Sequence, residues 1–176
     1  MGKRLNFWPL AGFLTVSVLG TLAHFAYEWS GKQLLAGAFC AVNESTWEHM
    51  KLLFVPWFLW TAAQCIGLRS LRPVGPRTVG LLAGMAAIPL LFYGYTGITG
   101  ANAGVVNVLI FQAAVLLAFW VSTALQKRGT LTAPVWQAAG VLVMAALCAA
   151  FVLWTVSPPA LPVFTDPVDG TRGVTT

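Results

Sequence analysis

The hydrophobic positions of the chain form five long runs, separated by short breaks rich in polar residues, glycine or proline. These runs cover residues 7–26, 50–68, 79–95, 104–125 and 134–156. Each run has a length near the roughly 20 apolar residues that a helix needs to cross a bilayer. The pattern therefore predicts an all-α integral membrane bundle of five transmembrane helices, forming a single domain over residues 1–176 with a tail at 157–176.

The breaks contain residues that end helices. Residues 69–77 include two prolines, and each proline removes a backbone donor and restricts the residue before it. Residues 96–104 form a glycine-rich segment typical of a turn, and residues 126–129 close the fourth run with two basic residues and a glycine. Basic residues and a glycine are preferred at helix C-termini, so we expect residues 126–129 to end the fourth helix and the other two breaks to lie outside the helices.

Composition excludes an ordinary soluble domain. Of the 176 residues, 58% are hydrophobic and 9% are charged, whereas soluble domains carry about 25% charged residues. The net charge of +5 would favour nucleic-acid binding in a soluble protein, but seven of the ten basic residues flank the apolar runs. We therefore interpret them as topology signals and expect no nucleic-acid partner. The three cysteines are odd in number and are predicted to be packing residues rather than a disulfide framework.

The basic residues also predict the orientation. If the runs alternate in direction, seven of them share one side: Lys3, Arg4, Arg69, Arg72, Arg77, Lys127 and Arg128. The other side holds Lys32, Lys51 and Arg172. The positive-inside rule then places the N-terminus inside and the C-terminus outside, with all five carboxylates on the outer, non-cytoplasmic face. A cleaved signal peptide is the alternative for the first run, which is longer than the usual 7–15-residue apolar region.

Both histidines and three of the five carboxylates lie between residues 24 and 49. Ionisable groups at the ends of membrane spans are costly to desolvate, which favours a functional site. His24 and Glu28 are four residues apart and share a helix face, and Glu44 and Glu48 have the same spacing, followed by His49. Imidazole and carboxylate groups suit zinc, iron or manganese. We therefore predict a divalent-metal cofactor with His24, Glu28 and His49 as ligands.

The remaining residues of this window predict a metal-dependent reaction. Glu48 or Glu44 is the candidate general base, and Lys51 would stabilise developing negative charge. A catalytic metal with three protein ligands keeps an open position for water or substrate. The pattern favours hydrolysis or group transfer on a lipid or cell-envelope substrate, with the lipid bilayer as the surrounding partner.

Two other readings of the window stay open. Residues 45–48 match the Ser/Thr-x-x-Glu capping box, Glu44 would complement a helix dipole, and Lys51 would pair with a neighbouring carboxylate. The protein would then be an accessory subunit whose motif caps a helix. A small transporter or ion-coupled protein is the other alternative, although Gln64 is the one polar residue that interrupts the second run beyond Lys51.

Two segments outside the runs are expected near this window. Residues 33–42 are apolar but too short to cross the membrane, which predicts an interfacial or re-entrant segment that folds the two halves of the window together. The tail at 157–176 is stiffened by prolines. It either docks on the outer face, where Asp166 or Asp169 would add an oxygen ligand, or forms a frayed terminus.

Three stretches carry a resemblance to a known family. They are His-Phe-Ala-Tyr-Glu-Trp-Ser-Gly at 24–31, Val-Asn-Glu-Ser-Thr-Trp-Glu-His-Met-Lys-Leu at 42–52, and the tail at 164–173. The chain resembles a family of short, multi-spanning bacterial membrane proteins of unknown function, which implies a location in the bacterial cytoplasmic (cell) membrane. The resemblance covers size, number of spans and these motifs, and it carries no activity to transfer. It implies that the motif positions are His24, Glu28, Asn43, Glu44, Glu48, His49 and Lys51.

Overall fold

The computed structural model describes the backbone of residues 2–174 and the side chains of residues 7–174. Its elements are α1 (Gly2–Trp29), α2 (Leu34–Gly37), α3 (Thr46–Leu68), α4 (Val74–Thr99), α5 (Gly104–Arg128), α6 (Pro134–Val156) and the 3₁₀ helix η1 (Pro162–Phe164). Five of the helices are long and apolar enough to cross a membrane, and no β-strand occurs within residues 2–174. The predicted all-α fold with five membrane spans is confirmed, while its orientation in the membrane stays a prediction.

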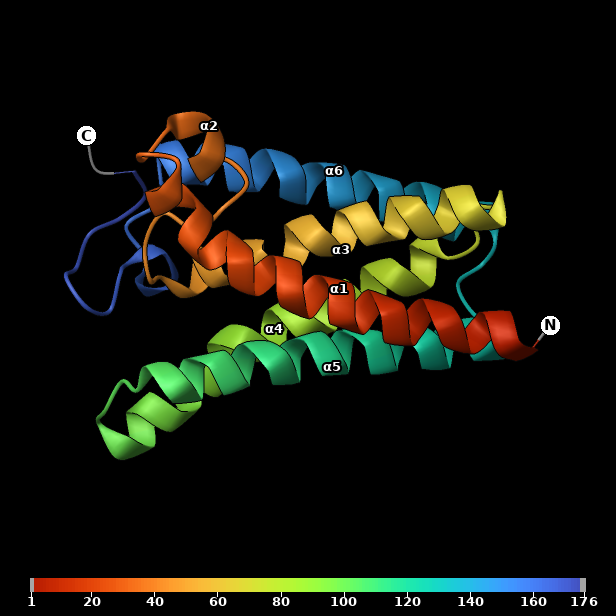
Figure 1. Ribbon diagram of the computed structural model, residues 1–176, viewed down its shortest axis with the longest axis horizontal. Helices are drawn as coiled ribbons and strands as arrows, with labels where there is room; N and C mark the ends of the chain where they lie inside the picture. The colour runs from red at the N-terminus through yellow and green to blue at the C-terminus, as the bar shows by residue number, and fades with distance from the viewer. Residues whose placement is uncertain (1, 175–176) are drawn as a thin grey trace.

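The five long helices run along the long axis of the molecule (Figure 1). Helix α4 packs along α5, and α1 packs on α3. The C-terminal end of α1, the short helix α2, the start of α3 and the C-terminal tail gather at one end, called the tail end below (Figure 1). Segments far apart in the sequence therefore meet there.

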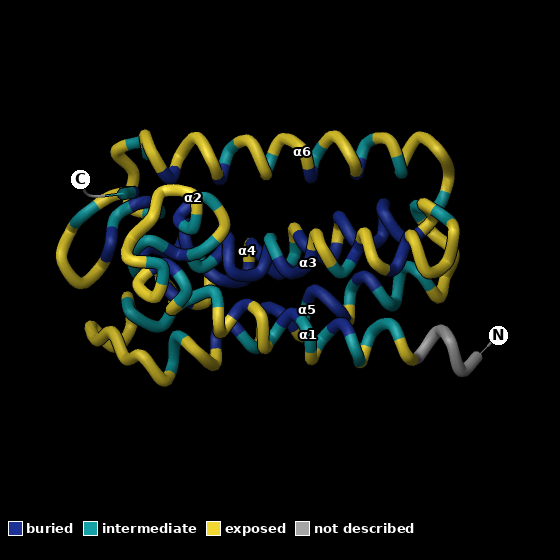
Figure 2. The backbone as a smooth tube through the Cα atoms, turned by 45° about the horizontal axis from the view of Figure 1, so that its top comes forward, coloured by how far each residue is buried: buried dark blue, intermediate teal, exposed yellow. Residues whose placement is uncertain are grey.

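The core lies between α3, α4 and α5, while most residues of α6 are exposed (Figure 2). Leu53, Leu81 and Val115 are each 0% exposed. The ring centroids of Trp57 and Phe119 lie 4.5 Å apart in the same core. The exposed outer faces are also apolar, as expected where lipid rather than water surrounds a helix bundle.

Helix boundaries depart from the predicted runs at several places, because α1 continues to Trp29, α3 begins at Thr46 and α5 continues to Arg128. Helix α4 begins at Val74, so the expectation that residues 74–77 lie outside a helix is wrong. Pro76 lies in the first turn, where backbone N–H groups have no acceptor within the helix, and a proline there loses no hydrogen bond. Helix α4 also continues to Thr99 and ends at Gly100, whose φ of 66° is accessible to glycine.

The contact between α4 and α5 leads to a first prediction. A Cβ atom added at Gly84 would lie 2.8 Å from the carbonyl oxygen of Ala114 and 2.9 Å from Cβ of Ala118, whereas one added at Gly94 meets nothing within 4 Å. We expect Gly84→Ala to lower the free energy of unfolding by about 1–3 kcal/mol through overpacking. Gly94→Ala should leave it unchanged or raise it by up to about 1 kcal/mol, because alanine favours helix.

Thermal unfolding of the two variants in the same detergent checks this pair. Both substitutions add one methyl group to the same helix, so the difference between them reports the packing of α4 on α5. Equal unfolding temperatures would contradict the close approach of the two helices.

Candidate metal centre

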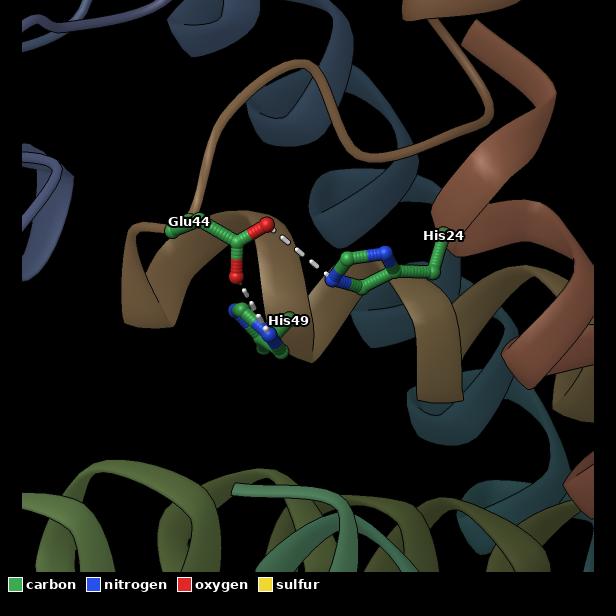
Figure 3. Close-up of side chains that lie close together, drawn as sticks. All are labelled: His24, Glu44 and His49. Atoms are coloured by element: carbon green, nitrogen blue, oxygen red, sulfur yellow. Dashed lines mark ion pairs between the residues drawn. The ribbon is translucent and has the colours of Figure 1, made fainter. Parts of the chain in front are cut away.

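His24, Glu44 and His49 come together at the tail end of the bundle (Figure 3). His24 lies near the C-terminal end of α1, His49 in the first turn of α3, and Glu44 in the loop that precedes α3. The Glu44 carboxylate lies between the rings, with Oε1 3.2 Å from Nε2 of His24 and Oε2 3.6 Å from Nε2 of His49. Two segments about 20 residues apart in the sequence therefore present their polar atoms to one another.

The donor set of this cluster fits a divalent transition metal. One ligand atom from each of the three residues lies within 4.8 Å of the others, and all three residues are half-buried. Two imidazoles and one carboxylate form a three-ligand set of the kind that leaves an open position on a catalytic zinc. The same set matches a two-histidine, one-carboxylate iron site. The cluster could hold zinc, iron or manganese, with Glu44 in the place that the sequence analysis assigned to Glu28.

The ring of His49 is oriented by the backbone of its own helix start. Its Nδ1 atom donates a hydrogen bond to the carbonyl oxygen of Ser45 at 2.9 Å. A proton on Nδ1 leaves Nε2, the atom that faces Glu44, as an unprotonated ligand. Ser45 is also the N-cap of α3, because its side chain accepts a hydrogen bond from the N–H of Glu48 at 3.4 Å. The cap thus fixes both the helix start and the ligand tautomer.

The C-terminal tail holds the loop that carries Glu44. Asp166, which is 5% exposed, accepts a hydrogen bond from the N–H of Glu44 at 2.8 Å and another from the N–H of Val168 at 2.7 Å. Phe164 is buried against Trp47, with ring centroids 4.9 Å apart. The tail therefore docks on the tail end, and Asp166 contacts the backbone of Glu44 rather than joining the ligand cluster.

The Glu44 carboxylate is held in its ionised form mainly by His24. The hydrogen bond from His24 lowers the pKa of Glu44 below its ordinary value, against the opposing effect of burial, and the charge of a protonated His24 lowers it further. A group whose pKa is lower in the folded protein stabilises it above the unfolded-state pKa, and this stabilisation is lost as the pH falls through the folded-state pKa. At neutral pH the carboxylate is therefore deprotonated, as metal binding requires.

Two cavities of different character meet at the cluster. An apolar cavity of about 260 Å³ lies between α1 and α5, and its lining includes His24, His49, Val108 and Phe111. A polar cavity of about 410 Å³ is lined by residues of the loop before α3 and of the tail. His24 and Glu44 line both cavities, so the cluster lies at the boundary between a polar and an apolar space.

Glu28 lies outside the cluster. Its Oε1 atom pairs with Nζ of Lys32 at 3.2 Å, and its side chain is 65% exposed. It lines the polar cavity together with His24. The shared helix face of residues 24 and 28 does not bring the two side chains to one centre, because Lys32, just beyond the end of α1, pairs with the carboxylate.

Glu48 and Lys51 form a separate, buried ion pair. The two side chains are 1% and 0% exposed, and Nζ of Lys51 lies 2.6 Å from Oε2 of Glu48. Lys51 also donates to Oγ1 of Thr155 at 2.6 Å and to the carbonyl oxygen of Gly37 at 2.8 Å. These bonds tie α3 to α6 and to α2, and neither charged residue is among those lining the two cavities.

The capping box predicted from the sequence is half formed. The Ser45 side chain caps the helix as expected, but the Glu48 carboxylate accepts a hydrogen bond from the N–H of Val42 at 3.1 Å. The N–H of Ser45 instead donates to Oδ1 of Asn43 at 3.0 Å. Glu48 therefore fastens the loop before α3 as well as pairing with Lys51.

Two residues that contribute to this region, Thr155 and Phe111, could not be identified from the sequence. Thr155 looks like an ordinary residue in the last turn of an apolar run, and Phe111 looks like a lipid-facing or core residue. In the structure Thr155 is 0% exposed and accepts from Lys51, while Phe111 lines the apolar cavity. The Asp-Pro-Val-Asp-Gly turn drew attention to Asp166, although as a possible ligand.

No curated protein and no solved structure matches the chain. A family model described as "Family of unknown function (DUF6512)" matches residues 2–174. The match covers nearly the whole chain, in agreement with the resemblance seen in the sequence. The chain therefore belongs to the DUF6512 family, whose function is unknown.

Proposed function

We propose that this membrane protein is a divalent-metal-dependent hydrolase or transferase that acts on a lipid or a lipid-like envelope compound. The observation that carries the proposal is the cluster of His24, Glu44 and His49, with ligand atoms within 4.8 Å of one another at the meeting point of a polar and an apolar cavity. The distribution of basic residues supports placing this site on the outer face of the membrane, and the family resemblance supports a bacterial cell membrane.

The chemistry of the site would come from the metal and its surroundings. A metal held by three protein ligands supplies a Lewis acid or a water molecule of lowered pKa. His24 and His49 would contribute Nε2, and Glu44 would contribute carboxylate oxygen. Glu44 thus has a ligand role in place of the base role predicted from the sequence. The roles predicted for Glu48, as general base, and for Lys51, in stabilising negative charge, are tested by the Lys51→Met variant described in the Discussion.

The cavities favour an amphiphilic substrate. Phe25 and Val108 line the apolar cavity and are 48% and 55% exposed, so the cavity reaches the apolar outer surface of the bundle. A hydrocarbon chain could enter there from the bilayer without crossing water. Its polar head would then lie beside His24 and Glu44, in the cavity that is also lined by Lys32 and Asp169.

Elemental analysis of detergent-purified protein tests the metal site. We expect near-stoichiometric zinc, iron or manganese, reduced by more than about tenfold in Glu44→Gln and in the His24→Ala/His49→Ala double variant, because each removes ligands from a three-ligand set. Glu28→Gln is the matched control, since it changes a carboxylate of the same window that lies outside the cluster. It should keep its metal.

The comparison separates the two possible ligand sets. Loss of metal in Glu28→Gln with retention in Glu44→Gln would favour the set predicted from the sequence. The proposal would be overturned if wild-type protein, prepared without chelators, contained no metal and still bound none after Zn²⁺ was added. Incubation of metal-loaded protein with a membrane lipid extract, followed by mass spectrometry of released products, then tests the reaction.

A further inference from the structure

A second apolar groove lies between α3 and α6, away from the metal centre. It has a volume of about 800 Å³, and residues of both helices and of the α3–α4 connection line it, among them Phe58, Cys65, Leu71, Val74, Met144 and Cys148. Helix α6 runs beside the rest of the bundle with most of its residues exposed (Figure 2). The groove therefore opens on the surface that the lipid bilayer surrounds.

Packing at its two ends holds the groove open. At the tail end, Phe151 of α6 lies against α3, with its ring centroid 4.5 Å from that of Trp47 and 5.1 Å from that of Phe54. Towards the opposite end α6 rests on α4 instead, where a Cβ atom added at Gly140 would lie 2.8 Å from Cγ1 of Val74. Helices α3 and α6 are thus in contact at one end and separated at the other.

The lining of the groove suits a hydrocarbon chain. The hydroxyl of Thr61, its most polar lining group, donates to the carbonyl oxygen of Trp57 at 2.8 Å. None of the lining residues is among those with a buried polar side-chain atom lacking a partner. The lining is therefore complementary to a hydrocarbon chain, whereas a strongly polar group buried there would lose its hydrogen bonds to water.

Two basic residues are next to the groove lining in the sequence. Arg69 and Arg72 flank Leu71, which lines the groove, and both are exposed. Arg69 is the C-cap of α3, and the N–H of Ser70 donates to the carbonyl oxygen of Cys65 at 3.0 Å, which fixes the connection against the helix end. All five carboxylates of the chain lie either between residues 28 and 48 or in the tail, so the connection that carries these two arginines holds no acidic residue that would compete with an anionic ligand.

We propose that the α3–α6 groove is a binding site for an anionic phospholipid. One acyl chain lies between α3 and α6, and the phosphate of the headgroup pairs with Arg69 and Arg72. Guanidinium groups bind phosphate oxygens through charge-assisted hydrogen bonds. The site is independent of the metal centre, because none of the groove residues lines the cavities at the tail end.

Native mass spectrometry tests this site on the full chain, with phosphatidylglycerol and phosphatidylcholine of equal chain length offered together. We expect one phosphatidylglycerol retained in preference to phosphatidylcholine. Ala145→Trp fills the groove and should abolish retention, whereas Ala146→Trp, on a neighbouring exposed position outside the groove lining, should not. Arg69→Gln/Arg72→Gln should lower retention by about fivefold per arginine removed, since each basic side chain at an anionic headgroup contributes about 1 kcal/mol.

The control for charge is Lys127→Gln/Arg128→Gln, a basic pair that ends α5 and should leave retention unchanged. Equal retention in Ala145→Trp and Ala146→Trp would overturn the site. Equal retention of the two lipids by the wild-type protein would overturn the role of the arginines. A dimer that Ala145→Trp dissociates would overturn the proposal in favour of a second copy of the chain as the occupant.

Discussion

Replacing Lys51 with methionine should lower the free energy of unfolding by about 3–5 kcal/mol, because it leaves the charge of Glu48 buried without its partner. The two side chains are 0% and 1% exposed, and the ammonium group also donates to Thr155 and to Gly37. Helices α3 and α6 would lose a polar connection between them. Reversible unfolding in mixed detergent micelles, followed by tryptophan fluorescence, measures the change.

Two further variants show whether the loss of stability comes from the unpaired buried charge. Adding Glu48→Gln to Lys51→Met removes the unpaired charge and keeps an acceptor for the N–H of Val42, so it should restore part of the lost stability. Lys32→Met breaks the exposed pair with Glu28, whose side chains are 64% and 65% exposed, and should cost no more than about 1 kcal/mol. Unchanged stability in Lys51→Met with loss of activity would instead favour the catalytic role that the sequence predicts for Lys51.

Replacing Asp166 with asparagine should weaken metal binding by about 10–100-fold, the usual effect of removing a group that orients a ligand. Asp166 accepts hydrogen bonds from the N–H groups of Glu44 and Val168. An asparagine side chain has one acceptor oxygen, so its amide group would face one of these two donors. The loop that carries Glu44 would move away from the two histidines.

Zinc titration with a competing chelator measures this effect. The matched control is Asp169→Asn, because Asp169 lies in the same tail and accepts hydrogen bonds from Thr171, at 2.8 Å from its N–H and 2.7 Å from its hydroxyl. Its affinity for zinc should match that of the wild type. If Asp166→Asn lowers the unfolding temperature of metal-free protein and leaves the zinc affinity unchanged, Asp166 stabilises the tail and does not position Glu44.

The spans could be predicted from the sequence because they depend on local composition. A run of about 20 apolar residues has few alternatives in a bilayer, since every backbone polar group must be paired within the segment. The residues at which the helices begin and end were predicted less accurately than the helices themselves. Val74–Arg77 joined α4 because a proline is tolerated in a first turn, which depends on where the helix begins and not on the residue type.

The sequence by itself determined that both histidines and three of the five carboxylates lie between residues 24 and 49, and it therefore predicted the site there. The tertiary structure decided which of them meet. The i, i+4 spacing pointed to Glu28, but the loop before α3 brings Glu44 between His24 and His49, while Glu48 and Lys51 are buried in a pair with Thr155, 107 residues from Glu48. Such contacts arise from the packing of distant segments, so no local pattern records them.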